Sequence, residues 1–163
     1  MEGVRIERAG AERLDELEPL WLSMHEHHVS VGSTIALRAP SETWPLRRAE
    51  YITWLAEPDA FVMIAEQDGR AIGYALVDYR ETDDVRITGA RFAVLKSLAV
   101  LPEARGRGVG TALMGAVYGE LRRLGIGELE IGVLFANDRA RRFYEREGFL
   151  PWAVEYFGPV PDR

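Results

Sequence analysis

Cysteine is absent from the 163 residues of this chain, which excludes disulfides, thiol catalysis and cysteine-ligated metals. Positive charge is also in deficit, because 20 Lys and Arg stand against 26 Asp and Glu, for a net charge of −6. That balance argues against nucleic-acid or acidic-membrane partners bound through the net field. No apolar run approaches the roughly 18 residues that span a bilayer, and the N-terminus has no signal-peptide core. We therefore expect a cytoplasmic protein with neither kind of partner.

The composition is that of one ordinary globular domain over residues 1–163, with 47% apolar and 28% charged residues. The run His25-Glu26-His27-His28 fails the zinc-protease pattern H-E-x-x-H because its fifth position is Val29. We expect no metal site. The tryptophans are expected in the core or in a pocket wall: Trp21, Trp44, Trp54 and Trp152.

Hydrophobic spacing in the first third predicts one short strand and two helical segments. Residues 4–8 alternate weakly, and residues 11–28 have near-helical spacing that Pro19 either kinks or divides into two helices. A further helix is predicted to enter at Thr43-Trp44-Pro45, with Pro45 in its first turn, and to run to about residue 55.

The middle of the chain predicts an antiparallel meander. Residues 61–66 and 71–79 are strand-like, and Asp68-Gly69 between them is a strong hairpin signal. A polar tip at residues 81–84 leads to a third strand over residues 90–100.

The last part predicts a change to parallel pairing. Strand 90–100, helix 111–124 and strand 128–133 form a βαβ unit, which pairs its strands in parallel. Asn137 is predicted to cap a helix over residues 138–147, and residues 149–157 are predicted as a last strand. The expected fold is mixed α/β: a largely antiparallel sheet with one parallel βαβ step, flanked by about four helices.

The stretch Arg105-Gly106-Arg107-Gly108-Val109-Gly110 lies between a predicted strand and a predicted helix. The amides at a helix N-terminus favour anions, and glycines allow phosphate oxygens to approach the backbone. Two arginines add charge-assisted hydrogen bonds. The pattern favours a diphosphate site over a plain tight turn.

Two familiar phosphate-binding patterns fit this turn less well. The Walker pattern is absent, since no Gly-Lys pair occurs there. The dinucleotide pattern G-x-G-x-x-G nearly fits from Gly106, but Thr111 stands at its third glycine, and the turn follows an antiparallel meander. Dinucleotide binding remains a weaker alternative.

The segment from Leu98 to Leu113 strongly resembles the acetyl-CoA-binding segment of the GNAT superfamily of N-acetyltransferases. Arg105, Gly108 and Gly110 match its signature [QR]-x-x-G-x-[GA], and the stretch from Asn137 to Phe149 resembles that family's "N-x-x-A-x-x-F-Y-x-x-x-G-F" helix. The resemblance implies acetyl-CoA as co-substrate and transfer of its acetyl group to a primary amine. Family members are often dimers, so monomer and homodimer both stay open.

By resemblance, the strand before the glycine turn and the strand at residues 128–133 diverge around the pantetheine arm. The backbone of Leu98 and Val100 would then bind pantetheine, with Asn137 near the thiol end. The diphosphate would lie against the turn, at these residues: Arg105, Gly106, Arg107, Gly108, Val109, Gly110 and Thr111.

The resemblance also assigns Tyr144 to the general acid that assists departure of the thiolate. Tyr titrates near ~10 and a thiol near ~8.5, so Tyr144 is better described as a protonated donor than as a full acid. Lys96 stands where many relatives place a Glu base. A water chain, Glu26, a histidine or Asp78 could take the proton of the acceptor amine instead, and the sequence does not choose among them.

The sequence thus predicts a direct-attack N-acetyltransferase for a small-molecule or peptide amine. A non-catalytic acyl-CoA sensor is the rival from another functional class. Neither the acceptor nor the preferred acyl chain length follows from the residues.

Overall fold

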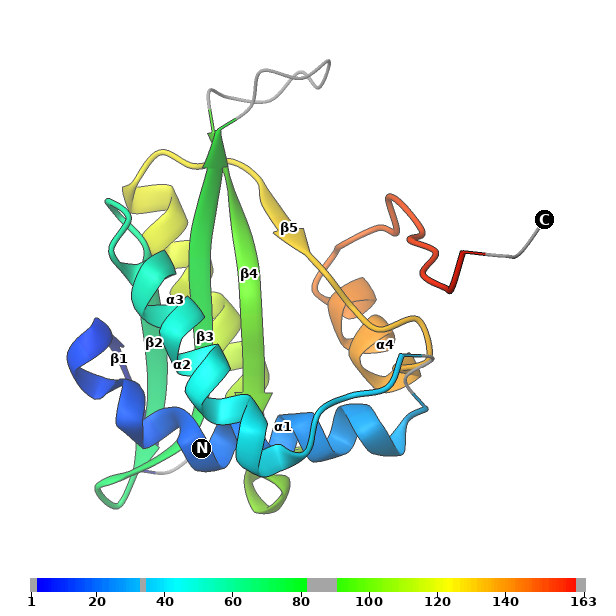
Figure 1. Ribbon diagram of the computed structural model, residues 1–163. Helices are drawn as coiled ribbons and strands as arrows, with labels where there is room; N and C mark the ends of the chain where they lie inside the picture. Colours follow the sequence, from blue (N-terminus) through cyan, green and yellow to red (C-terminus); the bar gives the residue numbers. More distant parts are fainter. Residues whose placement is uncertain (1–2, 33–34, 82–90, 161–163) are drawn as a thin grey trace.

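The computed structural model describes residues 3–32, 35–81 and 91–160. Its elements surround one five-stranded sheet in the order β1-β2-β3-β4-β5 (Figure 1). The strands are β1 (Arg5–Ala9), β2 (Phe61–Gln67), β3 (Arg70–Glu81), β4 (Arg91–Val100) and β5 (Leu129–Ile131). The α-helices are α1 (Glu18–Ser30), α2 (Pro40–Leu55), α3 (Val109–Arg123) and α4 (Asp138–Arg146). Two short 3-10 segments, η1 (Ala11–Leu17) and η2 (Pro102–Ala104), precede α1 and α3.

The predicted meander is confirmed, since β2, β3 and β4 pair antiparallel in succession. Asp68 and Gly69 both have positive φ in the tight turn between β2 and β3, as a two-residue hairpin loop requires. β1 adds a fourth antiparallel strand beside β2. Of the polar tip predicted at residues 81–84, only Glu81 is described, and it is the last residue of β3. Residues 82–84 lie outside the described residues.

The predicted parallel step is also confirmed, because β4 and β5, the strands that precede and follow α3 in the chain, pair in parallel. α3 begins two residues earlier than predicted and β5 is shorter, with three residues. The fold is the mixed α/β class expected from the sequence, and the described residues form four α-helices around the sheet.

The helices cover both faces of the sheet. α1 and α2 lie on one face and α3 on the other, while α4 lies beyond β5 (Figure 1). Because an apolar stripe recurs every four residues in α3, the helix buries Leu113, Val117 and Leu121 against the sheet. Tyr51 of α2 and Leu14 of η1 are fully buried on the opposite side. No helix in the described parts of the chain has the length and apolar character to cross a membrane.

The structure decides the two predictions that concern prolines inside helical segments, Pro19 and Pro45. Pro19 lies in the first turn of α1, so it starts a second helix rather than kinking one. The prediction for Pro45 was wrong: α2 begins at Pro40, and Pro45 lies inside it. Pro40 can start the helix because the N–H that proline lacks has no helical partner at that position.

The predicted last strand was wrong as well. Residues 149–157 have no regular secondary structure, and most of their side chains are exposed. Trp152, expected in the core or in a pocket wall, is 81% exposed. Trp21 and Trp44 are buried and Trp54 packs against the core, as expected.

Candidate functional site

The sheet opens between β4 and β5. Only Ala93, Val94 and Leu95 of β4 pair with β5, so the second half of β4 has no partner strand on that side among the described residues. The two strands diverge toward α1 (Figure 1). A cleft of about 670 Å³ occupies this region, lined by α1, α2, β4, the glycine turn, α3, residues 132–134 and α4.

A bulge in β4 shapes the floor of the cleft. Leu76 of β3 pairs with Ser97, but the next residue, Val77, pairs with Leu95. Lys96 is therefore the extra residue of the bulge, a feature that re-aims side chains and increases the local twist. Leu95, Lys96, Ser97 and Leu98 all line the cleft.

Ser97 belongs to a buried hydroxyl cluster that the sequence did not reveal. The Tyr51 hydroxyl lies 2.6 Å from Ser97 Oγ and 2.8 Å from the Tyr74 hydroxyl. Burial raises the pKa of both Tyr51 and Tyr74. Both phenols therefore stay protonated, and they hold Ser97 in place beside the bulge.

The glycine turn leads directly into α3. Gly106 and Gly108 have φ of 75° and 81°, the left-handed region that glycine enters without steric cost. Gly108 is the N-cap residue of α3, so the first unpaired amides of the helix follow it. Gly106, Gly108, Gly110 and Thr111 all line the cleft. The turn therefore presents a helix N-terminus to the cleft without a side chain at its two left-handed positions.

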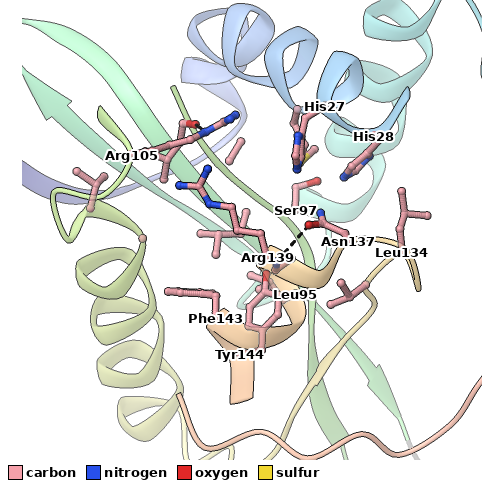
Figure 2. A pocket seen from close by; sticks show the side chains of 18 of the residues that line it. His27, His28, Leu95, Ser97, Arg105, Leu134, Asn137, Arg139, Phe143 and Tyr144 are labelled. Atoms are coloured by element: carbon pink, nitrogen blue, oxygen red, sulfur yellow. Dashed lines mark hydrogen bonds between the residues drawn. The ribbon is translucent and has the colours of Figure 1, made fainter. Parts of the chain in front are cut away.

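The two arginines of the turn have different surroundings. Arg105 Nε donates to the Val100 carbonyl at 2.9 Å, which ties the turn to the end of β4. Burial and the nearby Arg139 lower the pKa of Arg105. Figure 2 shows Arg105 and Arg139 on the same side of the cleft. Arg107 does not line the cleft, and its guanidinium donates to Gln67 Oε1 at 3.2 Å.

Asn137 has the capping geometry that its position predicted. Its side-chain oxygen accepts from the Ala140 amide at 3.1 Å, and the side chain is buried at the cleft wall. This cap fixes the first turn of α4, the helix that carries Arg139 and Tyr144 (Figure 2).

Tyr144 also lines the cleft. Its ring packs at centroid distances of 5.1 Å from Phe143 and 6.3 Å from Phe149. Burial raises the pKa of Tyr144, with a smaller contribution from Tyr118. The phenol is therefore a proton donor that remains protonated at neutral and moderately alkaline pH.

The structure separates the candidate proton acceptors. Glu26 is exposed and lies outside the cleft lining. Asp78 Oδ2 lies 3.5 Å from Lys96 Nζ, and Asp78 does not line the cleft either. His25 Nε2 is bound to the Arg38 carbonyl at 2.9 Å. His27 and His28, in contrast, point from α1 toward Ser97 and Asn137 (Figure 2).

The pKa of His28 is lowered mainly by desolvation, and also by the charges of His27, His25 and Arg47. Its imidazole is thus neutral at pH 7 and able to accept a proton. The described residues include no group of three or more His, Cys, Asp or Glu that could hold a metal ion.

The structure brings together all the predicted site residues except Arg107 around one cleft. The sequence reasoning missed Arg47 on α2 and Arg139 on α4, which line it too. Helical periodicity gives no signal for them, since it marks apolar faces and not which polar residue meets a cleft. Arg139 does lie within the second resemblance motif, two positions after Asn137.

The sheet opens beside a helix N-terminus that is preceded by glycines, an arrangement that suits an extended anionic ligand. The sequence profile of the acetyltransferase (GNAT) family matches residues 22–149. The chain therefore belongs to that family.

Individual relatives agree with this assignment. An uncharacterised N-acetyltransferase of Mycobacterium tuberculosis is 33% identical over 104 residues, which cover 64% of this chain and 62% of the relative. A mycothiol acetyltransferase of Propionibacterium freudenreichii is 28% identical over 148 residues, covering 91% of this chain and 43% of the relative. The match thus spans less than two thirds of the length of either relative.

A solved structure of similar fold is the aminoglycoside N-acetyltransferase AAC(6')-Iy in complex with CoA. It superimposes with a TM-score of 0.74 at 20% sequence identity, covering 96% of this chain and 94% of that one. At this identity the likeness concerns the fold.

Proposed function

We propose that the protein is an acetyl-CoA-dependent N-acetyltransferase that acts on a primary amine by direct attack. The observation that carries the proposal is the continuity of one cleft from the α3 N-terminus, past the open edge of β4, to Tyr144. The family assignment and the CoA complex of AAC(6')-Iy support the same ligand.

The residues of the cleft fit the parts of coenzyme A. The amides that follow Gly108 suit the diphosphate, because helix N-termini favour anions. Arg105 and Arg139 supply positive charge on that side (Figure 2). The unpaired edge of β4 near Leu98 suits the amide groups of the pantetheine arm, which would bind as an added strand does.

Tyr144 would stabilise the thiolate that departs when the amine attacks the thioester carbonyl. Its raised pKa keeps the donor proton in place. The same shift makes complete proton transfer to a thiolate less favourable, since an ordinary thiol titrates near ~8.5. Tyr144 therefore acts through a hydrogen bond to the developing charge.

His28 is the residue that we assign to the proton of the acceptor amine. An alkyl amine titrates near ~10.4, so it reaches the cleft mostly protonated. His28 lines the cleft, and its lowered pKa keeps the imidazole in the neutral form that can take a proton, while making it a weaker base than a free imidazole. Lys96 and Asp78 are less suitable, because Lys96 is a cation and Asp78, its partner at 3.5 Å, does not line the cleft.

Two measurements on the purified protein test this function. Calorimetry should detect binding of coenzyme A, and a thiol-release assay with acetyl-CoA should detect turnover with members of a broad panel of amines. Binding without turnover for any amine would favour an acyl-CoA sensor. Stronger thermal stabilisation by NAD than by coenzyme A would instead favour a dinucleotide-binding domain.

A further inference from the structure

The lining of the cleft includes two cations outside the glycine turn and α4, namely Arg47 of α2 and Lys96 of the β4 bulge. Trp21, Met24, His27 and His28 of α1 complete this part of the lining. We call these six residues the acceptor end. If the proposed function holds, this is the region in which the amine substrate lies.

Arg47 is held by aromatic rings. Its guanidinium carbon lies 4.4 Å from the centroid of Trp21 and 5.5 Å from that of Trp54. These contacts orient the group and remove part of its water. Its side chain is 28% exposed, and its charged partner Glu50, at 3.0 Å, is 53% exposed. Solvent therefore weakens the ion pair between Glu50 and Arg47. Glu50 does not line the cleft.

Lys96 lies on the same tryptophan. Its ammonium nitrogen is 4.5 Å from the centroid of Trp54 and 3.5 Å from Asp78 Oδ2. Lys96 has three N–H donors, so the contact with Asp78 leaves donors available toward the cleft. Asp78 is buried behind the lining rather than part of it.

Carboxylates are almost missing from the cleft surface. Glu155 is the one acidic side chain in its described lining, and no member of the acceptor end is acidic. An acceptor with several ammonium groups would therefore meet Arg47 and Lys96 at the acceptor end, where no lining residue is a carboxylate. Like charges in a partly desolvated site oppose binding.

We propose that the acceptor is an amine that also carries an anionic group, a carboxylate or a phosphate, which binds Arg47 with support from Lys96. Guanidinium groups match both kinds of anion with paired N–H donors. The inference rests on the proposed function and narrows its substrate class. Such a substrate would differ in charge from the aminoglycosides for which the similarly folded AAC(6')-Iy is named.

Matched acceptors test the charge preference in the thiol-release assay. Tyrosine is compared with tyramine, and O-phosphoethanolamine with ethanolamine, while kanamycin represents a polycation. The two anionic members distinguish carboxylate from phosphate. For the preferred anion, we expect kcat/KM to exceed that of its uncharged-tail counterpart by about tenfold or more, the usual effect of one charge-assisted hydrogen bond.

Arg47→Gln should remove most of this preference, measured as the ratio of kcat/KM for the anionic amine to kcat/KM for its neutral-tail counterpart. Arg48→Gln is the matched control, because Arg48 is the next residue and pairs with Asp15 at 2.6 Å, outside the cleft. It should behave like the unaltered protein. Equal losses for anionic and neutral-tail amines in Arg47→Gln would overturn the assignment of Arg47.

The unaltered protein decides the proposal even if Arg47→Gln does not fold. Binding of the same amines to its coenzyme A complex is measured by calorimetry in parallel. Tighter binding of an anionic amine supports the proposal, whereas equal or tighter binding of tyramine, ethanolamine or kanamycin overturns it. Failure of coenzyme A itself to bind would instead contradict the proposed function.

Discussion

Replacing Gly108 by alanine tests whether the turn before α3 holds a diphosphate. Gly108 has φ 81° and ψ 2° at the N-cap of α3. A residue with a Cβ in this left-handed conformation costs about 1–2 kcal/mol. For a domain of this size, each kcal/mol lowers Tm by about 2–4 °C. We therefore expect Gly108→Ala to lower Tm by about 2–8 °C.

The same substitution should weaken coenzyme A binding. If the strained turn relaxes, the amides at the start of α3 rotate and at least one hydrogen bond to the anion is lost. A hydrogen bond to a charged group contributes about 1.5–3 kcal/mol, which corresponds to roughly 10- to 150-fold in Kd. Calorimetric titration with coenzyme A at about 25 °C measures this change in Kd directly.

Gly125→Ala is the control, because Gly125 follows the other end of the same helix with φ 71°. No atom lies within 4 Å of a Cβ placed there, and the residue does not line the cleft. It should lower Tm by a similar amount and leave the Kd of coenzyme A unchanged. Equal Kd values for Gly108→Ala and Gly125→Ala would refute the role of the turn.

Three further outcomes follow from the site. Tyr144→Phe should lower kcat by about 10- to 100-fold through loss of one donor to the thiolate and leave the Kd of coenzyme A unchanged; an unchanged single-turnover rate would remove Tyr144 from this role. Because the pKa of His28 is lowered from 6.5, its base form persists below that pH, so kcat should begin to fall only under more acidic conditions. His28→Asn should abolish that acidic limb, and an identical pH profile would exclude His28 as the proton acceptor. Asn137→Ala removes the bond to the Ala140 amide and should cost about 1 kcal/mol of stability, measured by denaturant unfolding; unchanged stability would contradict the capping role.

Much of the fold follows from local sequence signals that the tertiary structure respects. The Asp68-Gly69 turn sets the register of its hairpin, and the apolar stripe of α3 sets which face meets the sheet. Both signals act over a few residues, so the sequence alone reveals them. Pro45 shows the limit: a proline can begin a helix, but Pro40 does so here and leaves Pro45 inside α2.

The prediction of a last strand over residues 149–157 was wrong for a different reason. Leu150, Trp152, Val154 and Tyr156 alternate with other residues as strand positions do, yet all four are exposed. A strand needs a neighbour for its backbone hydrogen bonds, and none of the described strands pairs with this segment. Alternation of side chains is a property of one chain segment, whereas strand formation also requires a neighbouring strand with which its backbone can pair.

The residues of the site also fall into those that local sequence patterns predict and those that depend on tertiary packing. The glycine turn and Asn137 act through their own backbone neighbourhood, so their spacing in sequence was informative. Arg47 reaches the cleft because α2 packs beside α1 and positions it on Trp21. That contact joins residues 26 positions apart in sequence, and no local pattern encodes it.

The charge of the acceptor end also bears on how the amine loses its proton. Lys96 stands where the resemblance led us to expect a Glu base, so this part of the described lining has no carboxylate that would stabilise the ammonium form. Nearby cations have the opposite effect, because they disfavour a like charge and lower the pKa of a bound amine. Arg47 and Lys96 both line the acceptor end, so an amine bound there would lie near both cations. The same two cations would thus select the substrate and increase the neutral fraction that attacks, which leaves His28 less of the deprotonation to perform.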